Sequence, residues 1–435
     1  MKIRTKHISI DEALAITPPK HQEPKKPNIL FRTVLLAASL PDIMATSFKF
    51  KKIRMEKAGK GPYLVLMNHS SFIDLEIAST VFYPQPQCIV CTTDALIGKK
   101  WLMRQIGCIP TQKFVSDYTL MQDIRYALKE KKCNVLMFPE AGYSLNGRAT
   151  PLPRKMGILL KKLDVPVIYV QTYGAFSRDP LYNGLQKRKV KVSADVTCLL
   201  TREEIKNSSV SEIDEIIDKA FSFDNFRWQQ ENGIEIKEKF RADGLERILY
   251  KCPNCKSEGQ TEGKGIHFTC KACGQRYELN TLGYLVAEDG KTEFDHIPDW
   301  FEWQREEVLK EINTGEYLLE DDVKIGILAD HKALYMVGEG TLTHTENGFE
   351  LKGCGGKLNY TQSPLSSYTL NSDYFWYEIG DVIGIGDKDR LYYCFPKNKN
   401  MVAKARLAAE ELYKIHQSKR RTPRVRTEVK EDGQQ

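Results

Sequence analysis

The 435-residue sequence lacks an apolar run long enough to cross a bilayer. Its most apolar N-terminal stretch is Asn28–Phe48. Arg32, Pro41 and Asp42 interrupt this stretch, whereas a membrane-spanning helix needs about 20 consecutive apolar residues. The first 28 residues are polar and rich in proline and lysine, so no secretory signal is evident, and no internal repeat is visible. We therefore expect a cytoplasmic protein and exclude the integral-membrane and repeat classes.

The sequence also lacks a disulfide pattern. Its 11 cysteines are an odd number, and four of them form one tight group. The other seven lie mostly in apolar runs: Cys88, Cys91, Cys108, Cys133, Cys198, Cys354 and Cys394. Scattered thiols of this kind are typical of a reducing compartment.

Positive charge is concentrated at the start of the chain. The net charge is +7, and residues 1–60 carry 13 Lys and Arg against 5 Asp and Glu, so the rest of the chain sums to −1. Such an arm favours an anionic surface, either a membrane or a nucleic acid. Residues 28–48 are then either core helices or an interfacial element. In the second case the six basic residues from Lys49 to Lys60 would face lipid headgroups. The apolar side chains that would enter the lipid are those of Leu30, Phe31, Val34, Leu35 and Ile43.

Short apolar strands alternate with helical segments from about residue 28 to 225. The predicted strands are Tyr63–Met67, Cys88–Cys91, Cys133–Phe138, Val165–Val170 and Val190–Cys198. The predicted helices are Phe72–Thr80, Tyr118–Lys131, Lys155–Lys162 and Val210–Phe221. This alternation predicts an α/β fold with a layered, mixed or mostly parallel sheet over residues 28–225.

The rest of the chain divides into segments of different composition. We expect a flexible basic lead over residues 1–27, a helical linker over 226–250, a zinc ribbon over 251–282 and a disordered tail over 418–435. Residues 283–417 show short strands, an Asn347-Gly348 hairpin signal and an amphipathic helix over Met401–His416. This pattern predicts a β-rich domain closed by a helix, which fits a pleckstrin-homology-like or GRAM-like barrel among other small β-domains.

The stretch Tyr63–Asp74 carries the first candidate site. An apolar strand stops at Asn68 and His69, and an apolar-periodic helix follows. His69 is thereby placed at the carboxyl end of a strand, where open α/β sheets bind their ligands. Asp74 can accept a ring N–H and leave the other ring nitrogen to remove a proton from a hydroxyl. The alternative is that Ser71-x-x-Asp74 is a capping box, which gives His69 no role.

Three later stretches place polar residues beside turns or strand ends. They are Gly107-Cys-Ile-Pro110-Thr-Gln-Lys113-Phe, Phe138-Pro139-Glu140-Ala141-Gly142-Tyr-Ser144 and Val165-Pro166-Val-Ile-Tyr-Val170. The last of these follows Arg154-Lys155-Met-Gly157. Lys113 supplies a cation after a turn, and Glu140 stands at a second strand's carboxyl end.

With these blocks the sequence resembles the glycerolipid acyltransferase family, which includes the lysophosphatidic-acid (1-acylglycerol-3-phosphate) acyltransferases. His69–Asp74 is similar to the family's H-x4-D motif, and Gly107–Lys113 is similar to its second block. Phe138–Glu140 is similar to the start of its F-P-E-G block, and Val165–Val167 is similar to its fourth block. The four blocks occur in the family's order, and the resemblance covers roughly residues 30–225.

Two positions depart from the family pattern. Lys113 stands where arginine is usual, which weakens bidentate phosphate recognition. The third block reads Ala141-Gly142-Tyr143-Ser144 in place of Gly-Thr-Arg-Ser, so its arginine is missing and Arg148 is the nearest substitute. These departures bear on the acceptor and leave the chemistry at His69 untouched.

The resemblance implies a membrane-associated O-acyltransferase of phospholipid synthesis at the inner face of the membrane. His69 would deprotonate a lysophospholipid hydroxyl, with 1-acylglycerol-3-phosphate the expected acceptor, and Asp74 would orient the imidazole. The donor would be an acyl thioester of coenzyme A or acyl-carrier protein, and no catalytic cofactor is needed. The implied substrate-binding residues are Asn68, Gly107, Lys113, Glu140, Ala141, Gly142, Arg148 and Lys155.

Some of these residues have simpler explanations. Lys113, Arg148 and Lys155 are the candidates for the acceptor phosphate, but Lys155 is alternatively a solvated cation. Glu140 is alternatively a helix-capping carboxylate. The altered loop is also compatible with another lipid acceptor. A catalytically silent lipid-binding or regulatory module is a further alternative, against which the intact His69 and Asp74 argue.

Two C-x2-C pairs predict a zinc site. They are Cys252-Pro-Asn-Cys255 and Cys270-Lys-Ala-Cys273, with fourteen residues between them. Four thiolates leave no open coordination position, so we expect a structural ion and no catalysis there. Nucleic-acid contact and a redox-sensitive clasp are alternatives, but the surrounding charge is only mildly basic, so nucleic acid is not an expected partner. His267 is a spare ligand that the site does not need.

Overall fold

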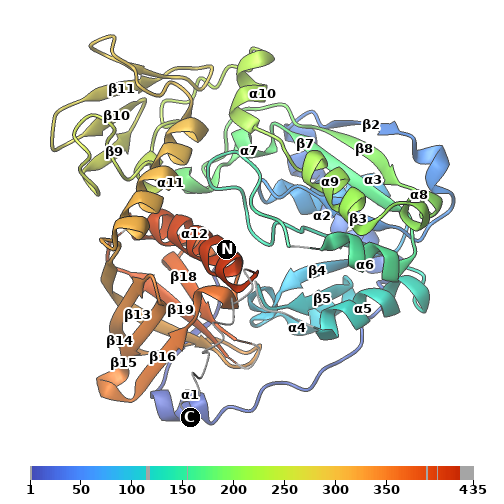
Figure 1. Ribbon diagram of the computed structural model, residues 1–435. Helices are drawn as coiled ribbons and strands as arrows, with labels where there is room; N and C mark the ends of the chain where they lie inside the picture. The colour runs from blue at the N-terminus through green and yellow to red at the C-terminus, as the bar shows by residue number, and fades with distance from the viewer. Residues whose placement is uncertain (1, 114–117, 154, 388–389, 399, 422–435) are drawn as a thin grey trace, which may run out of the picture.

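A computed structural model describes residues 2–113, 118–153, 155–387, 390–398 and 400–421. Its strands form three sheets of seven, four and eight strands (Figure 1). The described helices include none that is both long and apolar enough to cross a membrane.

The seven-stranded sheet has the order β2-β8-β7-β3-β6-β4-β5, and all its neighbours are parallel except β7 and β8. Its strands are β2 (Lys49–Ile53), β3 (Leu64–Met67), β4 (Gln87–Thr92), β5 (Cys108–Thr111), β6 (Asn134–Met137), β7 (Val167–Tyr173) and β8 (Ser193–Leu200). Each predicted strand overlaps one of these. The expected mixed, mostly parallel sheet is therefore confirmed.

Helices cover both faces of this sheet. They are α2 (Ile29–Ala45), α3 (Ile73–Phe82), α4 (Lys100–Gln105), α5 (Tyr118–Lys129), α6 (Met156–Leu163), α7 (Ala175–Arg178), α8 (Arg202–Asn207) and α9 (Val210–Ala220). The next helix, α10 (Asn225–Glu231), instead packs its Phe226 into the core of the C-terminal half. Successive residues of a strand point to opposite faces. Leu64 and Leu66 of β3 accordingly join the core under α5, α6 and α9, whereas Val65 and Met67 join the core under α2 and α3.

The four-stranded sheet is antiparallel and contains the C-x2-C pairs. Its strands are β9 (Thr261–Lys264), β10 (His267–Cys270), β11 (Arg276–Leu279) and β12 (Leu285–Ala287), so it extends beyond the expected limit at residue 282. The expected helical linker over 226–250 is wrong for most of its length. That segment contains α10 and the short η4 (Leu245–Arg247), and its apolar residues Leu245, Ile248 and Leu249 are fully buried in the largest core.

The eight-stranded sheet carries the order β16-β15-β14-β13-β19-β18-β17, with β1 added beside β14. Its strands are β1 (Thr5–His7), β13 (Leu319–Leu328), β14 (Leu334–Thr345), β15 (Gly348–Gly353), β16 (Leu358–Gln362), β17 (Asn371–Trp376), β18 (Gly380–Gly386) and β19 (Leu391–Pro396). The predicted hairpin at Asn347-Gly348 is present between β14 and β15. The described strand pairs do not join β16 to β17, and the pleckstrin-homology-like assignment stays a prediction.

Two long helices accompany this sheet, α11 (Ile297–Thr314) and α12 (Met401–Arg421). The predicted C-terminal helix is confirmed, and its Val402, Ala405 and Leu412 are buried as its periodicity requires. It continues to residue 421, so the first residues of the expected disordered tail are helical, and residues 422–435 lie outside the described part. In Figure 1, α12 lies at the centre of the molecule, between its own sheet and the seven-stranded sheet.

The N-terminal lead is not a flexible arm. β1 pairs with β14 in parallel, and α1 (Ile10–Leu14) begins with a capping box formed by Ser9 and Glu12. Ile10 is 3% exposed and packs in the core of the eight-stranded sheet (Figure 1, blue helix below the orange strands). The segment is therefore ordered by its backbone pairing and by this buried residue, although its basic, proline-rich composition predicts a flexible one.

After α1 the lead crosses to the seven-stranded sheet. Arg104 donates hydrogen bonds to the backbone oxygens of Gln22 and Glu23, and His21 contacts Asp123 at 3.0 Å. The first 27 residues therefore tie the C-terminal sheet to the N-terminal sheet.

The two large sheets also meet directly. The 3-10 turn η2 (Thr93–Leu96), which follows β4, contacts the C-terminal domain. The indole N–H of Trp376 donates to Asp94 at 3.1 Å, and the backbone N–H of Gly98 donates to His331 at 2.9 Å. The C-terminal domain thereby lies against the edge of the first sheet where β4 ends.

Candidate active site

Two of the sequence blocks meet at the carboxyl edge of the seven-stranded sheet. β3 and β6 are adjacent and parallel, with Leu66 opposite Met137. His69 follows β3 and Glu140 follows β6, so both emerge at the same edge. This arrangement is the usual location of a ligand site in an open α/β sheet.

Asp74 organises the turn that carries His69. This carboxylate is fully buried, and its Oδ2 accepts hydrogen bonds from His69 Nδ1 at 3.1 Å and from the backbone N–H groups of Ser70 at 2.6 Å and Ser71 at 3.0 Å. No serine hydroxyl caps α3, so the alternative capping box is not formed. One oxygen therefore closes the backbone turn and orients the imidazole, as the sequence had suggested.

The imidazole of His69 lies between two aromatic rings. Phe138 stacks on one side at a centroid distance of 4.1 Å, and Tyr143 lies against it at 4.0 Å. Burial lowers the pKa of His69 below 6.5, and this effect exceeds the opposing effects of the hydrogen bond that the ring donates to Asp74 and of the negative charge of that carboxylate. Nearby Lys113 lowers the pKa further. The ring is therefore neutral at neutral pH.

The neutral ring leaves one nitrogen available. Because Asp74 accepts a hydrogen bond from Nδ1, the proton of the neutral ring sits there and Nε2 carries the lone pair. Within the described part of the chain Nε2 has no hydrogen-bond partner, and the side chain of His69 is 19% exposed. This nitrogen is thus placed to take a proton from a bound molecule.

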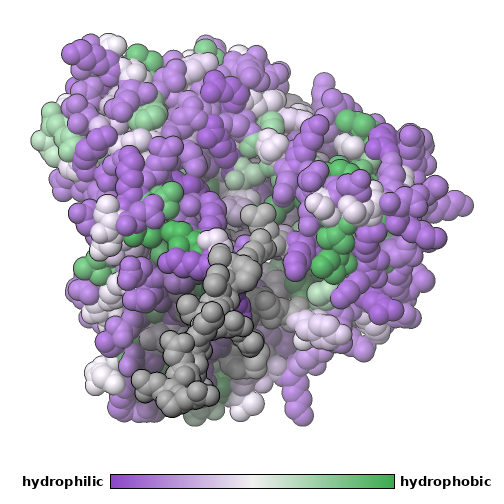
Figure 2. Space-filling model, in the orientation of Figure 1, coloured by the Kyte–Doolittle hydropathy of each residue, from purple (hydrophilic) through white to green (hydrophobic). Residues whose placement is uncertain are grey.

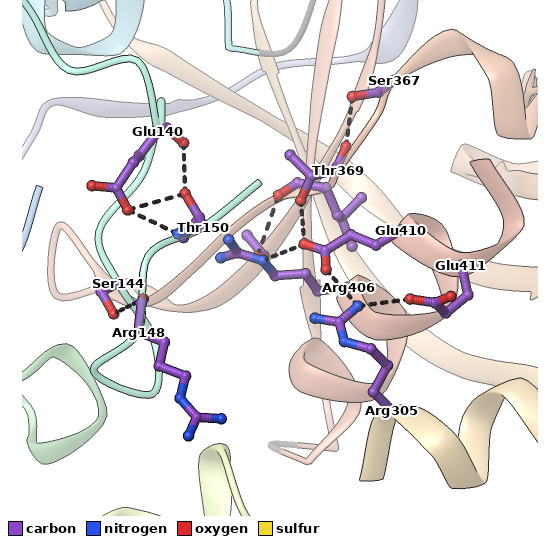
Figure 3. A network of polar contacts seen from close by, with 12 residues as sticks. Glu140, Ser144, Arg148, Thr150, Arg305, Ser367, Thr369, Arg406, Glu410 and Glu411 are labelled. Carbon is purple, nitrogen blue, oxygen red and sulfur yellow. Dashed lines mark hydrogen bonds and ion pairs between the residues drawn. The ribbon is translucent and has the colours of Figure 1, made fainter. Parts of the chain in front are cut away.

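Glu140 holds the backbone of His69. Its side chain is buried; Oε1 accepts from the His69 backbone N–H at 2.9 Å, and Oε2 accepts from the Thr150 backbone N–H at 2.9 Å. Figure 3 shows Glu140 and Thr150 joined in this way. The backbone N–H of Ser144 donates to His69 O at 2.9 Å, so both backbone groups of His69 are fixed by the loop after β6. Glu140 is a positioning residue here, and not the helix cap that was its alternative explanation.

Asn68 connects β3 to β7. Its Oδ1 accepts from the backbone N–H of Thr172 at 2.8 Å, and its Nδ2 donates to the Ser70 hydroxyl at 2.9 Å. Asn68 is buried, so it supports the turn and does not present its amide to a ligand. Ala141 and Gly142 form the adjacent turn, in which Ala141 has a left-handed backbone with φ of 52°.

Three of the predicted substrate-binding residues are not brought to His69. Gly107 precedes β5, whose first residue Cys108 is level with Val65 near the start of β3, so Gly107 lies toward the amino ends of these strands and away from His69. Arg148 donates to Asp224 at 2.8 Å and to Asp299 at 2.6 Å, and its side chain points away from Glu140 (Figure 3).

Lys155 is the third. It precedes α6 and lines a separate cavity of about 450 Å³ together with α9 and α12. Of the predicted cations, only Lys113 therefore lies close enough to His69 to act on its pKa.

Sequence reasoning missed the aromatic contacts of the imidazole. Tyr143 occupies the position at which the resembled family has arginine, and the absence of that arginine was the available signal. The contribution of the C-terminal domain was also missed, because nothing in the chain order indicates that Trp376 reaches Asp94.

The four cysteines come together as predicted. The Sγ atoms of Cys252 and Cys273 are 3.8 Å apart, those of Cys255 and Cys270 are 3.7 Å apart, and all four lie within 4.8 Å of one another. A tetrahedral zinc ion with Zn–S bonds of about 2.3 Å places its sulfurs about 3.8 Å apart. The cluster therefore fits such an ion. His267 contacts Glu288 instead of the cluster.

Comparison with known proteins found one family model and a similar solved structure. Residues 48–171 match a family model described as Acyltransferase. Among solved structures, the crystal structure of the 1-acyl-sn-glycerophosphate (LPA) acyltransferase PlsC from Thermotoga maritima is similar, with 16% sequence identity and a TM-score of 0.34 over 44% of this chain and 76% of that one. No curated protein matches this chain.

The buried carboxyl of Glu140 gives a pH-dependent prediction. Burial raises the pKa of Glu140 from 4.5 to about 7. The folded chain thus holds this proton more tightly than the unfolded chain, so the associated stability is present below pH 4.5 and is lost as pH rises through 7. Relative to Glu140→Gln, the free energy of unfolding of the wild type should fall by up to about 3 kcal/mol over this range in urea titrations. A difference that stays constant with pH would contradict the assignment; the exposed Glu346→Gln is the control.

The thiolate cluster gives a prediction about metal. Protein purified from zinc-containing medium should carry one zinc ion per chain by elemental mass spectrometry, because four thiolates at tetrahedral spacing bind zinc with free energies on the order of 10 kcal/mol. Cys270→Ser should lose the ion and at least about 3 kcal/mol of stability. Cys354→Ser, outside the cluster, is the matched control. Wild-type protein without metal, or a Cys270→Ser variant with undiminished metal, would refute the site.

Proposed function

We propose that this chain, whose residues 48–171 match the Acyltransferase family model, transfers a fatty acyl group from an acyl thioester to the hydroxyl of a lysophospholipid. The observation that carries the proposal is the His69–Asp74 pair, in which a neutral imidazole is hydrogen bonded through Nδ1 and keeps Nε2 available. Such a pair is the arrangement by which a histidine serves as a general base.

The reaction follows from this geometry. Nε2 of His69 takes the proton of the acceptor hydroxyl while the oxygen attacks the thioester carbonyl carbon. The new C–O bond forms, the C–S bond breaks, and the leaving thiolate receives the proton from the imidazolium. Asp74 stabilises the imidazolium between these steps, and no metal or organic cofactor takes part. The bound zinc ion that we propose at the cysteine cluster is structural.

The acceptor expected from the resemblance is 1-acylglycerol-3-phosphate. Lys113 supports a phosphate contact, whereas the guanidinium of Arg148 is committed to Asp224 and Asp299. This commitment favours a second candidate, the same transfer to a different lipid acceptor. The donor is either acyl-coenzyme A or acyl-carrier protein.

We further propose that the protein associates with an anionic membrane surface. The face shown in Figure 2 is mainly hydrophilic, with small apolar patches. On α2 and α4, however, these large apolar side chains are exposed: Ile29, Leu30, Val34, Leu40, Met44, Trp101 and Leu102. Phe31 of α2 meets Trp101 of α4 at a ring distance of 5.8 Å, so the two helices share one apolar surface suited to an interface. Ile43, expected to enter lipid, is instead buried in the core.

The test is an acyl-transfer assay on purified protein. Radiolabelled acyl-coenzyme A and acyl-carrier protein are offered with a panel of lysophospholipids, and His69→Ala is measured beside the wild type. We expect transfer by the wild type and a loss of at least about 10³-fold in the variant, because the base is removed. His267→Ala, which changes a histidine of the four-stranded sheet, is the matched control. Equal rates of transfer by the wild type and His69→Ala would contradict the role of His69 as the base, and no transfer from either donor would favour the silent lipid-binding module.

A further inference from the structure

The loop that follows β6 has little regular structure of its own. Between Met137, where β6 ends, and Met156, where α6 begins, the described residues contain no helix and only an isolated bridge at Arg148. Loops of this length without secondary structure are uncommon in compact domains and are usually functional. The contacts that order residues 138–153 therefore bear on the candidate active site.

This loop fixes the backbone of His69 at two points. The backbone N–H of Ser144 donates to the His69 oxygen at 2.9 Å, and the Glu140 carboxylate accepts from the His69 N–H at 2.9 Å. Glu140 is itself held by Thr150, whose backbone N–H and hydroxyl donate to it at 2.9 and 3.2 Å. A displacement of the loop would therefore displace the turn that carries the imidazole.

The backbone of Arg148 belongs to the same turn as Ser144. Its oxygen accepts a hydrogen bond from the Ser144 hydroxyl at 2.6 Å, and that hydroxyl accepts from the backbone N–H of Gly147 at 3.0 Å. Figure 3 shows Ser144 joined to Arg148, and the guanidinium pointing away from Glu140. The side chain of Arg148 thus leaves the loop at the point where its backbone helps to shape it.

The guanidinium joins the loop to two helices outside the acyltransferase sheet. Nε donates to Asp224 at 2.8 Å, and Nη2 donates to Asp299 at 2.6 Å. Asp224 caps α10 by accepting from the Arg227 backbone N–H at 2.9 Å, and the ring Nε2 of His296 lies 2.9 Å from it. Hydrogen bonds between charged groups are strong and directional, and a network of charges contributes more than an isolated surface pair.

One of these helices is packed on the sheet that contains the cysteine cluster. Trp300 follows Asp299 in α11, and its ring centroid lies 5.4 Å from that of Phe268 and 5.3 Å from that of Tyr277. The indole N–H of Trp300 also donates to the backbone oxygen of Lys251 at 2.9 Å. The position of Asp299 is therefore set by the four-stranded sheet.

The loop backbone also touches α10 directly. The oxygen of Gly147 accepts from the backbone N–H of Asn225 at 2.9 Å and from its side-chain amide at 2.8 Å. Gly147 has a φ of 90°, and a Cβ there would lie 2.8 Å from the ring of Phe226. The loop and α10 are thus in close contact beside Arg148, and the arginine reinforces this contact with charge.

We propose that Arg148 is a positioning residue for His69, and that α10, α11 and the four-stranded sheet are the support to which it holds the loop. This role needs no contact between Arg148 and either substrate. It acts through Ser144 and Glu140, which keep the imidazole in place, and a base displaced by about 1 Å can lose on the order of 10²-fold in rate. The inference rests on the proposed acyl transfer, and it gives the appended sheet a part in that reaction.

Steady-state kinetics on the full-length protein separate positioning from acceptor binding. Arg148→Ala should lower kcat by about 10- to 100-fold and leave KM for the lysophospholipid within about twofold. Arg148→Lys should retain part of the rate, because a lysine can pair with one aspartate but lacks the guanidinium fork. Arg227→Ala is the matched control: its side chain lies 3.9 Å from the same Asp299 but belongs to α10, so kcat should not change.

A double-mutant cycle tests the contact between Arg148 and Asp299. Asp299→Ala alone should lower kcat less than Arg148→Ala does, because Arg148 keeps its bond to Asp224. Adding Asp299→Ala to Arg148→Ala should cause no further loss, since the contact is already broken. Losses that multiply in the double variant would show that the two residues act independently, and would overturn the proposal.

Hydrogen exchange follows the turn without any catalysis. The chain has 8 histidines, so protein labelled with ¹⁵N-histidine gives few amide signals, and that of His69 is assigned by its loss in His69→Ala. This amide should exchange at least about tenfold faster in Arg148→Ala than in the wild type or Arg227→Ala. The amide of the buried His344 in β14 should be unchanged, which shows that the variant is folded.

The remaining results decide between the two proposals. A raised acceptor KM with unchanged kcat, as a phosphate-binding arginine would give, would overturn the positioning role, and so would unchanged exchange of the His69 amide in Arg148→Ala. If the wild type transfers no acyl group, the acyl-transfer proposal fails. The exchange comparison then still decides the role of Arg148, which faster exchange supports and equal exchange refutes.

Discussion

The candidate active site depends on one carboxylate oxygen. Oδ2 of Asp74 accepts three hydrogen bonds, one from the imidazole of His69 and two from backbone N–H groups of the serines that follow it. The side chain is fully buried, so water does not compete for these bonds. The carboxylate fixes the conformation of the strand-to-helix turn and, through the same atom, determines which imidazole nitrogen carries the proton.

The rest of the sheet keeps this turn in place. The Glu140 carboxylate accepts a hydrogen bond from the backbone N–H of His69, and the backbone N–H of Ser144 donates to the backbone oxygen of His69. The side-chain oxygen of Asn68 accepts a hydrogen bond from β7. These contacts come from strands that are neighbours of β3, so the parallel pairing of β3 with β6 and β7 is what brings the loops together. The C-terminal domain contacts the same edge of the sheet, because the indole N–H of Trp376 donates a hydrogen bond to Asp94 just beyond the end of β4.

Local sequence patterns predicted the features that local structure determines. The apolar run before His69 and the spacing to Asp74 were enough to place both residues at a sheet edge, since a buried strand and the following helical turn fix their relation. The two cysteine pairs were likewise sufficient for the thiolate cluster, whose spacing the antiparallel strands preserve.

Features that depend on distant residues were not predictable. Arg148 was an acceptor candidate by position alone, and its partners Asp224 and Asp299 lie 76 and 151 residues further along the chain. The lead was expected to be flexible because its composition gives no sign of pairing with β14. The contact of Tyr143 with the imidazole has the same origin, because a loop conformation and the packing of a second domain decide it.

The central claim is that Asp74 and burial keep His69 neutral with its proton on Nδ1. The most direct test is ¹⁵N NMR of protein labelled at histidine, with His69 assigned by its loss in His69→Ala. The account predicts a protonated Nδ1, an unprotonated Nε2 and a pKa below 6.5, and in Asp74→Asn a loss of the preference for the Nδ1 proton. An imidazolium at neutral pH, or a neutral ring with its proton on Nε2, would contradict it.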